Sequence, residues 1–210
     1  MASCFHIIKQ KARIILGLLS LLALPACLAA PLVDENRELA DHGQVFDGAV
    51  TIPAPDGYCL DEATSKATAN PPVLVFASCQ ALGQTNTPPP NTLAIVTATI
   101  MPDPVPVERN AQPELLAFFQ SQGGLSLMSR GARTEISIVD HSQQSDDYFW
   151  VLAREDRAPR HLSPWIWFGL TEVSGHGVTV SVYPASDHHG DDDAAGKLLF
   201  TSFLQRLAKR

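Results

Sequence analysis

Hydrophobic and polar residues alternate along several short segments of the chain, which is the pattern of strands that bury one face. The clearest segment is 178–183, in which three valines point to one side and Thr179, Ser181 and Tyr183 to the other. Proline- and glycine-rich breaks set the limits of further strands. Together the predicted strands cover residues 46–52, 73–78, 93–101, 134–140, 148–154, 164–171 and 178–183.

Apolar residues recur at helical spacing in two other places. One helix is predicted to begin at Pro113 and to end before Gly123 and Gly124, and the other covers residues 194–208. A further short turn is expected over residues 125–129. Consecutive strands with short links pair in an antiparallel sheet, so the order of elements predicts an α+β fold with an antiparallel sheet of about six or seven strands flanked by helices.

The start of the chain follows a different pattern. Lys9, Lys11 and Arg13 precede an apolar run over residues 14–24, which is the order of charge and hydrophobicity in a secretory signal peptide. A membrane-spanning helix needs about 20 apolar residues, so this run is too short to be a good permanent anchor. We therefore expect export from the cytoplasm.

Residues 24–27, with the sequence Leu-Pro-Ala-Cys, resemble the lipobox of bacterial lipoproteins, although a small residue is commoner than the proline. The resemblance implies lipidation of Cys27 and a membrane-anchored protein on the periplasmic side of the cell envelope. Cleavage after Ala29 or Ala30 is the alternative, and it would leave a periplasmic protein without Cys27. The expected organisation is a signal peptide over residues 1–26, a tether over residues 27–45 and a single α+β domain over residues 46–210.

The charge of the mature chain limits its partners. Removal of the signal peptide takes three of the 15 basic residues and none of the 22 acidic ones, which leaves a formal charge of −10. Nucleic-acid binding needs a basic face that displaces phosphate counterions. We therefore expect no nucleic-acid partner.

Only Cys59 and Cys79 remain as thiols in the exported domain, since Cys4 leaves with the signal peptide. An even pair in an oxidising compartment favours a disulfide. A redox pair or a metal-binding pair is the alternative, but the first favours closer spacing and the second needs further ligands nearby.

The loop over residues 187–193 carries the densest set of metal-ligating side chains, including His188, His189 and Asp191. Imidazole and carboxylate groups suit a divalent metal. However, aspartates before a helix also cap its free amides, and this explanation is favoured. We therefore expect no cofactor and no tight metal site, with these three residues as weak candidates.

Trp150, Trp165 and Trp167 admit two interpretations. They could form an aromatic platform for a sugar or a peptide, but packing in the core or under a helix is favoured. No nucleophile elbow, phosphate-binding loop, dinucleotide fingerprint or zinc-protease motif is present in the sequence, so it indicates no catalytic residues.

The order of elements, with its closing hairpin and helix, resembles the PsbP-type α/β/α sandwich, and residues 46–57 are similar to the first strand and turn of that fold. Residues 57–61 (Gly-Tyr-Cys-Leu-Asp) and 77–79 (Ala-Ser-Cys) resemble a group of small exported alphaproteobacterial proteins. Neither resemblance implies a catalytic residue in this chain.

The function expected from these observations is that of a non-catalytic envelope lipoprotein, which binds or scaffolds an envelope protein or a small ligand at the membrane surface. The alternatives are a metal-dependent envelope hydrolase that uses the loop at residues 187–193 and a binding module for a small ligand or a metal ion. A cleft with convergent His and Asp side chains would favour an enzyme, whereas an exposed apolar or aromatic patch would favour an adaptor.

Overall fold

The structure is a computed structural model, which describes residues 38–129, 135–142, 147–186 and 194–209. The predicted signal peptide and Cys27 lie outside the described residues, as does the loop that contains His188, His189 and Asp191. No helix within the described ranges is long and apolar enough to cross a membrane.

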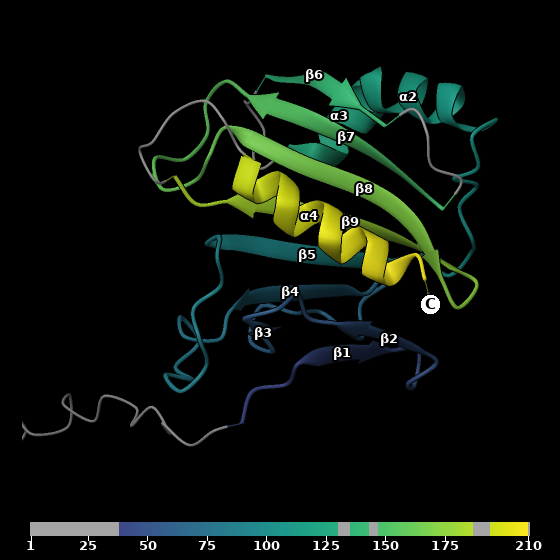
Figure 1. Cartoon of the computed structure of the whole chain (residues 1–210). Coiled ribbons are helices and arrows are strands. Elements are labelled where there is room, and N and C mark those ends of the chain that lie inside the picture. Colours follow the sequence, from purple (N-terminus) through teal and green to yellow (C-terminus); the bar gives the residue numbers. More distant parts are fainter. Residues whose placement is uncertain (1–37, 130–134, 143–146, 187–193, 210) are drawn as a thin grey trace, which may run out of the picture. The chain divides into compact units, whose positions relative to one another are not determined.

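A seven-stranded antiparallel sheet forms the centre of the domain, in the order β3-β4-β5-β9-β8-β7-β6 (Figure 1). In the described residues, three helices and a separate two-stranded hairpin accompany it, which confirms the predicted α+β class. The sheet strands are β3 (Tyr58–Leu60), β4 (Val73–Ser78), β5 (Ala94–Ile100), β6 (Ile136–His141), β7 (Tyr148–Glu155), β8 (Trp165–Val173) and β9 (His176–Pro184). The other elements are β1 (His42–Val45), β2 (Val50–Pro53), α2 (Gln112–Gln120), α3 (Gln122–Met128) and α4 (Ala194–Leu207).

One face of the sheet packs against α4, which lies across β8 and β9 (Figure 1). The apolar residues of α4 recur every three or four positions, so they form one stripe that the sheet buries. Gly169 on β8 permits this close approach, because a Cβ atom there would lie 2.7 Å from Phe200 and 2.9 Å from Leu204. The hairpin of β1 and β2 adds Val50 and Ile52 to the same core.

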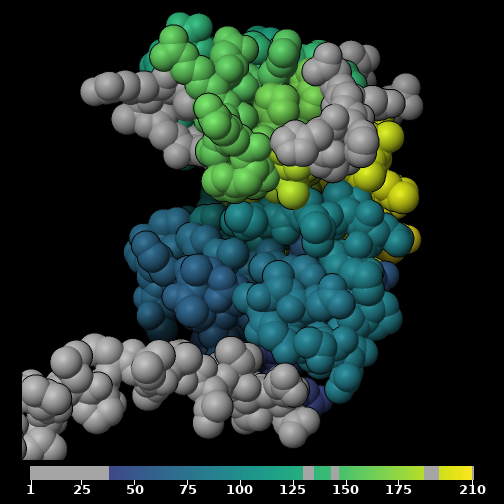
Figure 2. Space-filling model, turned by 90° about the vertical axis from the view of Figure 1, so that its left-hand side faces the viewer, coloured from purple at the N-terminus to yellow at the C-terminus, as the bar shows by residue number. Residues whose placement is uncertain are grey.

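The opposite face carries a second core, formed where α2 and α3 pack against the half of the sheet that contains β6, β7 and β8. Phe119 of α2 lies against Phe149 and Phe168, with ring centroids 5.9 and 5.1 Å apart. Between β4 and β5 a long segment forms a lobe, which is teal in the foreground of Figure 2.

The structure corrects two predictions near the start of the domain and adds one strand. The segment predicted as one strand over residues 46–52 begins with a turn, because Phe46, Asp47 and Gly48 have φ angles of 53°, 54° and 87°. β1 lies inside the expected tether and Val45 is buried, so the folded part of the chain begins before residue 46. The three-residue strand β3 was not predicted, since it is too short for a periodic pattern.

α2 ends at Gln120, before the two glycines as predicted, but the short turn expected over residues 125–129 is a helix that begins earlier and includes both glycines. They lie within α3, and a Cβ atom at Gly124 would lie 2.3 Å from the carbonyl oxygen of Phe118. The predicted hairpin between β8 and β9 is confirmed. Its two turn residues, Ser174 and Gly175, have φ angles of 52° and 78°, which is typical of a type I′ turn.

Candidate binding groove

The disulfide expected between Cys59 and Cys79 is present, with the two Cα atoms 4.9 Å apart. It joins β3 to the residue that follows β4, and both residues are almost fully buried. The bond therefore fixes the edge strand of the sheet to the start of the lobe.

Of the three tryptophans singled out from the sequence, Trp150 and Trp167 are packed under α4, whereas the ring of Trp165 lies 5.5 Å from the guanidinium carbon of Arg154. The ring centroids of Trp150 and Trp167 are 5.5 Å apart, and Phe200 of α4 stacks on Trp167. The Lys197 Nζ atom lies about 6 Å from both indole rings, which is cation–π distance. Trp167 is 3% exposed, so this pair forms part of the core and no open platform for a ligand.

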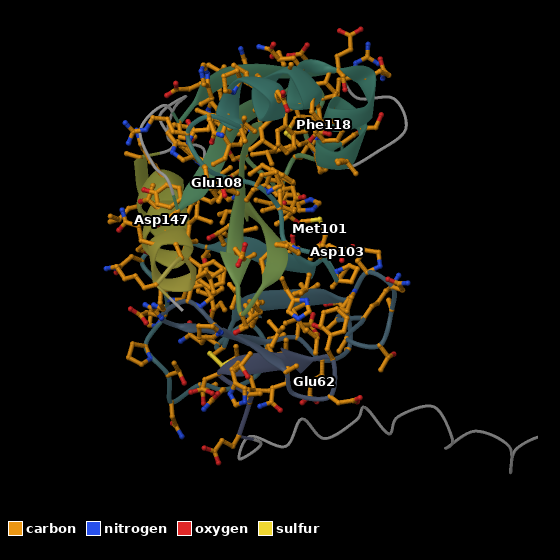
Figure 3. All side chains as sticks on the ribbon, turned by 90° about the vertical axis from the view of Figure 1, so that its right-hand side faces the viewer. Glu62, Met101, Asp103, Glu108, Phe118 and Asp147 are labelled. Atoms are coloured by element: carbon orange, nitrogen blue, oxygen red, sulfur yellow. A yellow bond between two sulfur atoms is a disulfide. The ribbon has the colours of Figure 1, made fainter. Side chains whose placement is uncertain are left out.

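A cavity of about 720 Å³ lies beside the disulfide, at the β3 edge of the sheet. A second cavity of about 390 Å³ shares Leu39 and Glu62 with the first, so the two adjoin. We call the two cavities together the β3 groove. Glu62 lies at the end of the domain that carries β1, β2 and β3, and Phe118 lies at the opposite end (Figure 3). The lining consists of residues 38–41, residues 53–63, Cys79, Leu82, Gln84, Thr87 and Arg206.

Backbone hydrogen bonds and one glycine build the walls of the groove. The Leu60 amide donates to the carbonyl oxygen of Ala40 at 2.8 Å, which holds the entering chain against β3. The Cys79 amide donates to the carbonyl oxygen of Gly57 at 3.1 Å. Gly57 has a φ angle of 80°, and a Cβ atom there would lie 3.0 Å from Pro90, so this turn requires glycine for two independent reasons.

Three buried side chains lie beneath the larger cavity. Tyr58, Cys59 and Cys79 are 2%, 4% and 3% exposed. The Tyr58 hydroxyl donates to the carbonyl oxygen of Thr92 at 2.5 Å, and burial raises the pKa of Tyr58 to about 12. The half-buried side chains of Leu39, Leu60 and Leu82 form the apolar base of the groove, which lies in the smaller cavity.

The rim of the groove is acidic. It contains five carboxylates but a single guanidinium among the lining residues, that of Arg206. Arg206 donates to Asp56 at 2.9 Å. His42 is bonded to Asp41 at 2.8 Å, and this hydrogen bond lowers the pKa of Asp41. Asp61 accepts from the Thr64 hydroxyl at 2.6 Å. The five carboxylates belong to Glu38, Asp41, Asp56, Asp61 and Glu62.

A second surface lies on the part of the sheet that α2 and α3 do not cover. On β4, β5 and β9 the side chains that point away from the main core are uncharged, and most of them are partly exposed. Ile95 is 41% exposed and the neighbouring Leu93 is 58% exposed. This sheet surface is uncharged and open, whereas the β3 groove is concave and acidic.

Sequence reasoning identified the two cysteines of the groove but not its other members. Residues 38–41 were assigned to the tether, although they line the larger cavity. The acidic residues among positions 53–62 lie between turn-forming residues and do not form a recognisable binding motif. Within the described ranges, no group of three His, Cys, Asp or Glu side chains is placed to hold a metal ion.

Comparisons with known proteins add little to this description. No protein-family model matches the chain, and no curated protein matches it. The solved structure of a mutant of the protein Mog1 aligns with a TM-score of 0.46 and 12% sequence identity. The alignment covers 80% of this chain and 92% of that one. The fold and the groove define the chain as an α+β domain with an acidic groove at one sheet edge.

Proposed function

We propose that the chain is a non-catalytic lipoprotein of the bacterial cell envelope, whose α+β domain binds a partner in the β3 groove. The observation that carries this proposal is the groove itself, with its apolar base, its charged rim and its cavities of about 720 and 390 Å³. Clefts of this kind are the usual position of binding sites.

The chemical state of the groove supports binding more than catalysis. The sulfur atoms of Cys59 and Cys79 are bonded to each other, so neither is available as a nucleophile. Burial keeps the phenol of Tyr58 neutral, and its hydroxyl donates a hydrogen bond to the backbone carbonyl of Thr92. Asp56 and Asp61 are engaged in bonds that shape the rim. These groups give the groove a defined form and charge.

A lipid on Cys27 would keep the groove close to the membrane. Glu38, the first described residue, lines the larger cavity and follows Cys27 by 11 positions. Even a fully extended chain of this length spans at most about 40 Å. A partner in the groove would therefore be held near the membrane surface, as a scaffold requires.

The lipid anchor is tested with Cys27→Ala in the native host. We expect wild-type protein in the membrane fraction, and we expect the variant to be soluble in the periplasm or to remain an uncleaved precursor. A variant that is processed and located like the wild type would show that the signal is an ordinary secretory one.

Binding in the groove is tested by photo-crosslinking in intact cells. A photoreactive amino acid replaces Gln84, which lines the groove, and a control replaces Leu127, which is 62% exposed on α3 and remote from the lining residues. We expect a discrete adduct from position 84 and none from position 127. If position 84 gives no adduct while a third probe at Ile95 gives one, the partner binds the open sheet surface and the proposal of a groove partner is wrong.

A further inference from the structure

We infer that the occupant of the β3 groove is a basic segment of a partner protein, in which Lys or Arg side chains alternate with apolar ones. This inference rests on the proposed function and names the chemistry of the partner. It follows from three features of the groove: its charge, its apolar base and its two adjoining cavities.

The charge of the rim selects a cationic occupant. Five carboxylates surround the two cavities, and Arg206, their one cationic neighbour in the described lining, already donates to Asp56 and to the carbonyl oxygen of Ala54. The side chains of Asp41 and Asp56 are each 91% exposed, so their charges face solvent and an incoming segment. An anionic ligand such as a nucleic acid or a phosphate headgroup would be repelled, whereas a basic segment is steered toward the groove.

The apolar base suits the long stems of basic residues. Leu39, Leu60 and Leu82 line the smaller cavity together with Ala63, and Asp61 and Glu62 lie at the same cavity. Lys and Arg bury their methylene stems on apolar surface while the charged head stays near water or a carboxylate. Apolar side chains in alternate positions of an extended segment would enter the cavities themselves.

The two cavities favour a segment of chain over a compact ligand, because they adjoin through Leu39 and Glu62 and together are lined by residues 38–41 and 53–63. β3 is the outer strand of the sheet, but its outward amides already donate within the chain, that of Tyr58 to Pro55 and that of Leu60 to Ala40. The segment is therefore bound through its side chains and does not add a strand to the sheet.

The inference is tested with the mature, disulfide-bonded protein and fluorescent peptides of about nine residues, which span roughly 30 Å when extended. One peptide alternates Lys with Leu, and a second alternates Glu with Leu. Fluorescence anisotropy is measured at physiological ionic strength. We expect the basic peptide to bind with saturation and the acidic peptide not to bind.

Two double variants separate the groove from the overall negative charge. Glu38→Gln with Asp41→Asn removes two carboxylates of the rim, and Asp103→Asn with Glu108→Gln removes two exposed carboxylates that do not line the groove. Both variants have the same net charge. We expect the groove variant to weaken binding of the basic peptide at least about tenfold and the control variant to weaken it less than about twofold.

The outcomes distinguish this inference from the function on which it rests. Equal weakening in both variants would show attraction by net charge alone and overturn the basic-segment inference. The same inference is overturned if the basic peptide does not bind while the crosslink at Gln84 still forms, and the groove then binds a partner of other chemistry. If neither peptide binding nor the crosslink is found, the proposed function is overturned as well.

Discussion

Loss of the Cys59–Cys79 disulfide is expected to remove a large part of the stability of this domain. We consider the double variant Cys59→Ala with Cys79→Ala. The bond closes a loop with a sequence separation of 20, and the chain-entropy relation for a loop of that length gives a stabilisation of about 3 kcal/mol. Because both cysteines are almost fully buried, loss of their packing adds roughly 1 kcal/mol.

The expected loss of about 3–4 kcal/mol is large compared with the roughly 5–15 kcal/mol that is typical of a domain. Much of it should act through the unfolded state, because the reduced chain has more conformations when unfolded. The unfolded variant should also expose more surface, so the slope of its free energy against urea concentration should be steeper than that of the wild type.

Urea denaturation followed by circular dichroism measures both quantities. Wild-type protein under reducing conditions is the second comparison, since it loses the bond without losing the sulfur atoms. We expect it to be destabilised by about 3 kcal/mol relative to the oxidised protein. If oxidised and reduced wild type unfold at the same urea concentration, the entropic reasoning is refuted and β3 does not depend on the bond.

Two further predictions concern single residues. Burial raises the pKa of Tyr58 to about 12, so the contribution of its neutral phenol to stability is complete below pH 10 and is lost as the pH rises from about 10 to 12. Ultraviolet titration should show that one tyrosine ionises later than the others, and Tyr58→Phe should remove that late step. Gly169→Ala should lower the free energy of unfolding by roughly 1–3 kcal/mol, because the new Cβ atom would collide with Phe200 and Leu204. Gly175→Ala has open space around it but a φ angle of 78°, so it should lower the free energy of unfolding by only about 1 kcal/mol. Thermal unfolding that ranks the two glycine variants the other way would contradict this reasoning.

Local sequence patterns determined much of the secondary structure. Alternation predicted β9, where the valines are buried and Thr179 is half-buried, because a strand with one covered face needs that pattern. Helical spacing predicted α4, and the expected closing hairpin is the one that β8 and β9 form. The Cys59–Cys79 bond was also predicted from the cysteine count and the expected export of the chain. These features depend on residues that are close in the sequence or, for the disulfide, on the number of cysteines.

The order of the strands and the β3 groove were decided by the tertiary structure. β9 lies between β5 and β8, and Ala98 is paired with Val180, a contact between segments that share no local signal. Phe46 has a left-handed backbone with a φ angle of 53°, which a bulky aromatic residue rarely adopts. The groove joins residues 38–41, 53–63 and 79–87 with Arg206, and it exists because pairing at the sheet edge brings them together. Local patterns carry no information about such long-range pairing, because the free energy that selects it comes from burial across the whole core.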